Sequence, residues 1–190
     1  ELSALGYYVR VHACNAVHYG TPQVRVRLVF VACKFMPITA PAWAVTKATT
    51  VGDVLGSSFE VTSHPELRLT ERDDEVIRRF ELASRVRRPR DLVRSLPSRG
   101  VTASNTLGVT GSTMRLLQDD GVTRRRLLEE EIGVLQDYEA EHITALGRRG
   151  ISRRQVLKAL GDAVPKRLSH AWAFHIRSLI GEYLGLMQQL

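Results

Sequence analysis

Cysteine is scarce in this sequence, and that scarcity limits the kinds of site it can build. Only Cys14 and Cys33 occur among 190 residues, with no C-x-x-C spacing and no histidine at ligand spacing. We therefore expect no zinc site and no other metal. A reduced, intracellular setting fits this usage, the nucleus in a eukaryote or the cytoplasm in a bacterium. An incidental pairing of the two cysteines on neighbouring strands stays open.

Long apolar runs and targeting signals are also missing. No stretch reaches the length of a membrane span and no signal-peptide pattern opens the chain, so we expect no membrane partner. The first residue is Glu rather than Met. We expect the chain to begin inside a longer polypeptide or to have been processed.

Arginine, in contrast, is abundant. The formal net charge is +7 and the pI is near 9.9, while 44% hydrophobic residues indicate a globular chain of one domain or two small ones. A basic balance favours a polyanionic partner, because neutralised phosphates release counterions. Solvated helix ends are the alternative. The excess charge is concentrated in five clusters: Arg78-Arg79, Arg85 to Arg90, Arg124 to Arg126, Arg148-Arg149 and Arg153-Arg154.

The stretch 19–31 combines a turn with a strand. Gly20 and Pro22 mark the turn, and the β-branched run after them predicts a largely buried strand. Period-two geometry places Gln23, Arg25 and Arg27 together on one face. Polar side chains at the end of a buried strand suit a pocket for an anion or an acceptor-rich ring, because a guanidinium can donate to two acceptors. An exposed edge strand with solvated arginines would give the same pattern.

The residues around this stretch resemble one protein family. Gly6 to Val11 and Asn15 to Arg27 follow the pattern L-G-Y, strand, N-A-x-x-Y-G-x-P-Q-x-R-x-R, strand, of the DNA (cytosine-5)-methyltransferases. The resemblance implies that Gln23, Arg25 and Arg27 lie beside a flipped-out target cytosine and its flanking backbone. It points to Arg27 as the residue that touches the base.

A second segment, 125–138, is helical by propensity and has acidic residues where they favour a helix start. Its order resembles R-x-L-T-x-x-E-x-x-x-L-Q-G-F-P of the same family. The resemblance implies that Arg125, Glu131 and Gln136 organise a small target-recognition lobe. The segment departs from the pattern at Leu128, Asp137, Tyr138 and Glu139.

A third segment, 161–165, reads Gly-Asp-Ala-Val-Pro and resembles the family's final G-N-A-V-P motif. The resemblance implies that Asp162, Ala163 and Val164 line a pocket for S-adenosyl-L-methionine. Asp162 replaces the usual Asn, so a donor is lost and a negative charge is added near the cofactor. An ordinary helix break before Pro165 is the alternative. Ser152 can cap a preceding helix through Leu160, and a long helix is expected from 165 to about 188.

These segments predict an α/β fold: the C-terminal part of a Rossmann-like methyltransferase with a small mixed target-recognition lobe. Residues 1–36 would form an edge hairpin with antiparallel strands 7–13 and 24–33, and residues 37–124 the recognition region. Residues 125–160 would form its helical organiser, and residues 161–190 the terminal helix. Within the recognition region, Gly52-Asp53 and 119–121 are expected as turns, 113–118 as a strand, and Thr70 as the cap of a helix whose buried side carries Val76, Ile77, Phe80, Leu82 and Ala83.

Several family motifs are missing from this chain. It has no F-x-G-x-G loop, no E-N-V segment, and neither cysteine follows a proline. We therefore expect no catalytic nucleophile here, and partners consisting of double-stranded DNA and an N-terminal catalytic portion in the same or a separate chain. The leading hypothesis is the C-terminal portion of a DNA (cytosine-5)-methyltransferase. A non-catalytic DNA-binding or regulatory relative and a transfer-RNA methyltransferase of the same fold are the alternatives.

Overall fold

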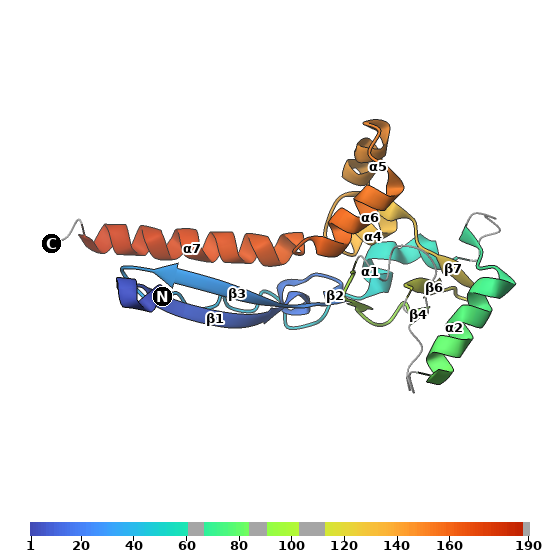
Figure 1. Cartoon of the computed structure of the whole chain (residues 1–190), viewed down its shortest axis with the longest axis horizontal. Coiled ribbons are helices and arrows are strands. Elements are labelled where there is room, and N and C mark those ends of the chain that lie inside the picture. Colours follow the sequence, from blue (N-terminus) through green and yellow to red (C-terminus); the bar gives the residue numbers. More distant parts are fainter. Residues whose placement is uncertain (61–66, 84–90, 103–112, 188–190) are drawn as a thin grey trace.

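A computed structural model describes residues 1–60, 67–83, 91–102 and 113–187. The chain forms an elongated arm and a small lobe (Figure 1). The arm, residues 1–45 and 163–187, consists of a long hairpin with the last helix along it. The lobe, residues 51–60, 67–83, 91–102 and 113–162, gathers the shorter helices and strands at the other end. The first residues of the chain and the end of the last helix lie at the far end of the arm (Figure 1).

The arm's hairpin pairs β1 (Tyr8–Asn15) with β3 (Val26–Cys33) in antiparallel register. The connection contains a short helix, η2 (Ala16–Tyr19), and the two-residue strand β2 (Gln23–Val24). The predicted hairpin is therefore confirmed, with each strand displaced by a residue or two. Both cysteines are free, and the register places Cys14 opposite Arg27 and Cys33 opposite Tyr8, at opposite ends of the hairpin.

Helix α7 (Lys166–Met187) covers one face of the hairpin and confirms the predicted terminal helix. Leu168 and Trp172 are buried in a cluster with Cys14, Ala16, Tyr19 and Ile38. Other apolar residues of α7, such as Phe174, Ile180 and Leu184, are more than half exposed.

The opposite face of the hairpin is bare. Val11, Val26, Leu28 and Phe30 are 52%, 54%, 60% and 70% exposed. The register places Val11 opposite Phe30, so these side chains form one continuous apolar surface. The expectation of a largely buried strand is therefore wrong for this face, because among the described residues α7 covers the other side of the hairpin.

The lobe is built from short elements around one hydrophobic cluster drawn from residues 51–160. The elements of the lobe are α1 (Val51–Leu55), η3 (Gly56–Phe59), α2 (Glu71–Ala83), β4 (Asp91–Leu92), β5 (Ser98–Arg99), β6 (Arg115–Leu117), β7 (Arg124–Arg126), α4 (Glu129–Val134), α5 (Ala140–Arg148) and α6 (Arg153–Asp162). Strand β6 pairs parallel with β4 and antiparallel with β7, while β5 pairs parallel with β2 and so joins the lobe to the arm.

Capping residues define several helix starts. The predicted cap at Thr70 is confirmed, since its Oγ1 accepts from the Asp73 N–H while Asp73 accepts from the Thr70 N–H. Thr50 and Asp53 form the same arrangement and begin α1, so the turn predicted at Gly52-Asp53 is wrong. A Cβ on Gly52 would lie 2.6 Å from the carbonyl oxygen of Arg94, which explains a glycine inside this helix.

Three further helix predictions need correction. Residues 124–126 form β7, and α4 begins only after Leu128, because pairing with β6 outweighs the helical propensity of the segment. Helix α6 continues through Gly161 to Asp162. Among the expected apolar residues of α2, Ile77 is buried, whereas Leu82 is 69% exposed.

The predictions for residues 113–121 hold. Strand β6 lies within the expected segment, and Gly121 closes the turn with a φ of 70° and a bond from its N–H to the Gln118 carbonyl.

No helix in the described ranges is long and apolar enough to cross a membrane. Within the same ranges no group of three or more His, Cys, Asp or Glu residues could hold a metal ion.

Candidate functional site

Gln23 stands at the junction of the arm and the lobe and is completely buried. Its Nε2 donates to the Leu135 carbonyl at 2.6 Å and to Gln136 Oε1 at 3.0 Å. Its Oε1 accepts from the Val101 N–H at 3.0 Å. These bonds occupy both amide protons, so Gln23 fastens the strand to the lobe.

Arg25 is also buried, with 3% of its surface exposed. Its Nη2 donates to the carbonyls of Gly161 and Ala163, both at 2.8 Å. It therefore holds the turn between α6 and α7, where helix carbonyls lack intrahelical partners. Burial, and then the charge of Arg27, lower the pKa of Arg25 to about 10, while Asp162 opposes the shift. A pKa near 10 keeps this guanidinium charged at neutral pH.

Arg27 is more exposed than Gln23 and Arg25. It is half-buried, and its Nη1 donates to the Val26 carbonyl at 3.1 Å. It forms no ion pair with any residue that the structure describes. Nε and Nη1 of Arg25 also lack a partner among the described residues, but they are buried. Of Gln23, Arg25 and Arg27, only Arg27 is partly exposed and can reach a ligand at the surface.

The turn of residues 162–164 lies at the surface beside Arg25. Asp162 is 59% exposed and accepts from Lys158 Nζ at 2.5 Å. Val164 is 42% exposed, whereas the Ala163 carbonyl is bound by Arg25. The turn thus presents a carboxylate and an apolar side chain next to each other. That pair fits a ligand with an amino or hydroxyl donor beside an apolar surface, as S-adenosyl-L-methionine has.

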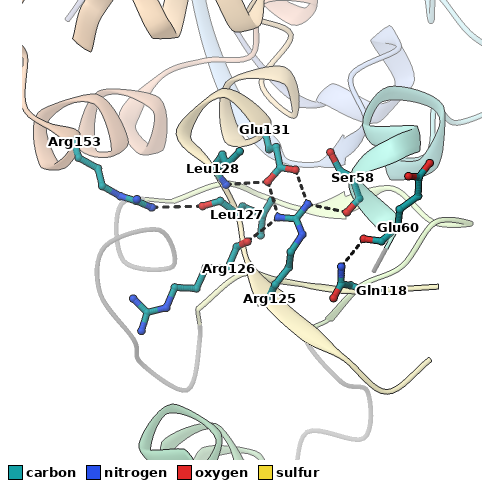
Figure 2. Close-up of polar contacts among 9 residues, drawn as sticks. All are labelled: Ser58, Glu60, Gln118, Arg125, Arg126, Leu127, Leu128, Glu131 and Arg153. Atoms are coloured by element: carbon teal, nitrogen blue, oxygen red, sulfur yellow. Dashed lines mark hydrogen bonds and ion pairs between the residues drawn. The ribbon is translucent and has the colours of Figure 1, made fainter. Parts of the chain in front are cut away.

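Arg125 and Glu131 form a buried, two-pronged ion pair at the start of α4 (Figure 2). The two N–O distances are 2.9 and 2.6 Å. Arg125 also donates to the Ser58 carbonyl, and Glu131 accepts from the Leu128 N–H. Burial raises the pKa of Glu131, but the bonds from Arg125, the Ser58 side chain and Leu128 outweigh it, and the net pKa lies below the ordinary value.

Gln136 completes this set at the other end of α4 and is completely buried. Its Nε2 donates to the Leu160 carbonyl at 2.7 Å, and its Oε1 accepts from Gln23. The bond to Leu160 reaches α6, and the bond to Gln23 reaches β2. Gln136 therefore connects the end of α4 to the end of α6 and to β2.

Sequence reasoning missed the network formed by Asp137, Thr21 and Arg167. Asp137 adopts a φ of 67°, and its Oδ2 accepts from Thr21 Oγ1 at 2.6 Å. Arg167 in turn donates to the Gly20 carbonyl at 2.5 Å. The available signal was Asp137 at a position where the resembling pattern has glycine, the residue that most readily adopts positive φ.

Two of the arginine clusters, 78–79 and 124–126, form ion pairs within the chain. Arg124, Arg125 and Arg126 pair with Asp91, Glu131 and Asp73 respectively. Arg78 and Arg79 both pair with Glu75. The side chains of Arg78 and Arg79 stay 65% and 76% exposed, so phosphate contact by these clusters stays a prediction. The cluster 85–90, and the small polar residues 103–106 considered as hydrogen-bonding groups, lie outside the described residues.

Comparison with known proteins identifies the class to which this arrangement belongs. Residues 1–176 match the model of the C-5 cytosine-specific DNA methylase family, and the chain belongs to that family. It is 33% identical over 177 residues to the type II methyltransferase M.AplI of Arthrospira platensis. That match covers 93% of this chain and 50% of M.AplI, so the chain spans about half the length of this relative.

Solved methyltransferase structures share the fold, which confirms the predicted α/β class. The S. pombe Dnmt2 methyltransferase matches with a TM-score of 0.67 at 15% identity, covering 97% of this chain and 60% of that protein. The Entamoeba histolytica methyltransferase EhMeth matches with a TM-score of 0.65, also at 15% identity, covering 94% and 56%.

Proposed function

We propose that this chain is the C-terminal portion of a DNA (cytosine-5)-methyltransferase, which transfers a methyl group from S-adenosyl-L-methionine to cytosine C5 in double-stranded DNA. The observation that carries the proposal is the half-buried guanidinium of Arg27, free of ion pairs within the described chain. It lies beside Arg25, which holds the turn of Asp162. The proposed base-binding donor therefore lies next to the arginine that holds the proposed cofactor wall.

Each residue of the site then has its own task. Arg27 donates to the acceptor edge of the extruded cytosine, and its fork can hold two acceptors in one plane. Gln23 and Arg25 position it from the preceding residues, since the Gln23 amide binds the lobe and Arg25 Nη2 binds the α6–α7 turn. Arg125, Glu131 and Gln136 organise the target-recognition lobe by fixing both ends of α4.

Asp162, Ala163 and Val164 would form one wall of the S-adenosyl-L-methionine pocket. When bound, this cofactor supplies the electrophilic methyl group. The Asp162 carboxylate would accept from an amino or hydroxyl group, while Val164 offers apolar contact. Because Arg25 binds the carbonyls of Gly161 and Ala163, the link between β2 and β3, which leads directly to Arg27, also sets the position of this wall.

The covalent chemistry requires a thiolate that adds to the base, and neither cysteine of this chain suits that role. Cys14 is buried under α7, and neither Cys14 nor Cys33 follows a proline. The nucleophile and the remaining cofactor contacts would come from an N-terminal catalytic portion, in the same or a separate chain. The bare apolar face around Leu28 and Phe30 supports such a partner, since exposed patches of this kind mark interfaces.

The test compares Arg27→Ala with Arg10→Ala, in the enzyme assembled from this chain and its catalytic portion. Arg10 is an exposed arginine on the same hairpin and serves as the matched control. We expect methyl transfer to a cytosine-containing duplex to fall roughly ten- to a hundredfold for Arg27→Ala only, as for loss of a good base contact. Both variants should keep the wild-type melting temperature. Equal transfer by the two variants would contradict the proposal.

A non-catalytic DNA-binding or regulatory relative is the second candidate, and one observation favours it. Asp162 places a negative charge where the resembling motif has a neutral amide, and Lys158 already occupies that carboxylate. Such a relative would bind duplex DNA with a steep salt dependence but bind no S-adenosyl-L-methionine. Calorimetric titration of the assembled protein with the cofactor separates the two candidates. Competition between duplex DNA and RNA at matched salt tests an RNA substrate.

A further inference from the structure

The backbone of Asp137 adopts a conformation that few side chains accept. Its φ is 67°, and it is the one non-glycine residue with positive φ in the described chain. Aspartate tolerates this region better than most residues, but glycine adopts it freely. The backbone of Asp137 is therefore strained relative to glycine, and contacts of its side chain must offset that cost.

The carboxylate of Asp137 is buried, with 5% of the side chain exposed, and both oxygens have partners. Its Oδ2 accepts from Thr21 Oγ1 at 2.6 Å and from the Arg167 N–H at 3.4 Å. Its Oδ1 lies 3.4 Å from Arg167 Nε. The Arg167 N–H belongs to the first turn of α7, where a negative charge is favourable.

Arg167 extends the network to the residue before Thr21. Its Nη1 donates to the Gly20 carbonyl at 2.5 Å. Gly20 has a φ of 87°, and a Cβ built on it would lie 3.0 Å from Arg167 Nη1. Asp137 and Arg167 therefore both hold the turn 20–22, directly before the segment 23–27 that contains β2 and the start of β3.

We propose that Asp137 is a positioning residue whose carboxylate locks the turn 20–22 against the first turn of α7. Gln136, its neighbour, holds Gln23 in the same way, so two consecutive residues fix the start of the strand. The consequence of this contact, a fixed position of Arg27 relative to the base, rests on the proposed function. The mechanical part of the lock can be measured without any activity.

Hydrogen exchange read by mass spectrometry tests the mechanical part. Asp137→Gly removes the carboxylate and relieves the backbone, so any loosening belongs to the lost bonds. We expect amide exchange in peptides covering 16–27 to accelerate about ten- to hundredfold, as for loss of a charged hydrogen bond. Peptides covering 51–59 should not change. Glu139→Gln, which breaks a neighbouring exposed pair with Lys166, is the matched control and should leave both regions unchanged.

A double-mutant cycle separates a lock from general weakening. Thr21→Val removes the donor of the 2.6 Å bond, and we expect most of the acceleration seen in Asp137→Gly. The double variant should exchange little faster than Asp137→Gly alone. Asp137→Asn keeps an acceptor for Thr21 and should be intermediate. Unchanged exchange over 16–27 in Asp137→Gly, or additive single effects, would overturn the proposal.

Activity of the assembled enzyme tests the consequence. We expect Asp137→Gly to lower kcat more than it raises KM for the duplex, because the strand is misplaced while the DNA contacts persist. Faster exchange with unchanged kcat would overturn the positioning role. If Arg27→Ala also left transfer unchanged, the proposed base contact itself would fail, and exchange would still report on the lock.

Discussion

The side-chain amides of Gln23 and Gln136 lie against each other, with 3.0 Å between Nε2 and Oε1. The two residues are 113 positions apart, and both are completely buried. Gln23 belongs to the turn-strand stretch of the arm, and Gln136 closes helix α4 of the lobe. This pair is therefore the polar centre of the junction between the two parts.

Replacing Gln136 with Leu should destabilise the chain by about 1–3 kcal/mol, because the Leu160 carbonyl and the Gln23 amide lose their buried partner. Urea unfolding followed by circular dichroism measures this loss. Gln155→Leu, at an exposed capping position, should cost less than about 1 kcal/mol. Equal losses in the two variants would show that the buried amide pair carries no special weight.

Gly133 allows α4 and α5 to approach closely. A Cβ on Gly133 would lie 2.5 Å from Cγ1 of the buried Ile143. Gly133→Ala should therefore cost about 1–3 kcal/mol through overpacking. Gly147→Ala, with nothing within 4 Å, should instead stabilise α5 by about 0.5–1 kcal/mol.

The steric origin of the Gly133 effect can be checked in an Ile143→Ala background. There Gly133→Ala should cost nothing, since the clashing side chain is gone. Thermal unfolding of the four variants gives the comparison. An undiminished penalty in the Ile143→Ala background would point to a backbone effect.

The ion pair of Arg125 and Glu131 should make stability depend on acid. The pKa of Glu131 lies below the ordinary value of 4.5, so the folded state binds this proton more weakly than the unfolded state. The pair's contribution is complete above pH 4.5 and disappears as the pH falls through the lowered pKa.

Glu131→Gln should therefore lower stability at pH 7 by about 3–5 kcal/mol, because Arg125 is left as a buried charge without a counterion. The difference from wild type should shrink as the pH falls below 4.5. Urea unfolding from pH 7 to pH 3 measures it, and the exposed Glu141→Gln reports the effect of removing a surface carboxylate. A difference that stays constant over this range would contradict the assignment.

The bare face of the hairpin should behave as a surface and not as a core. Phe30→Ser, at a 70% exposed position, should change the unfolding free energy by no more than about 0.5 kcal/mol. It should also reduce binding of a hydrophobic dye. Leu168→Ala on the covered face should cost about 2–5 kcal/mol. A core-like loss for Phe30→Ser would mean that the face is covered within this chain.

Local signals in the sequence predicted the arm well. A turn at Gly20 and Pro22 followed by alternating residues indicates a hairpin, and the helix expected from 165 to about 188 is α7. The box at Thr70 and Asp73 is similarly local, since both partners lie within one helical turn. Such patterns determine secondary structure because the contacts that stabilise it are close in the sequence.

The partners of the buried polar groups could not be predicted from neighbouring residues in the sequence. The sequence placed Gln23, Arg25 and Arg27 on one face of a strand, but the structure gives the first two to the interior and leaves Arg27 free. The sequence also indicated a helix at 125–138, whereas Arg125 belongs to a strand. In both cases the deciding partners lie far away in the chain.

The sequence by itself therefore determined the family, the hairpin and the terminal helix. Tertiary structure alone decided which arginines are counterions, which amides hold the lobe to the arm, and why Asp137 accepts positive φ. The physical reason is the cost of burying a polar group without a partner. That cost is offset only by donors and acceptors that the complete fold brings together.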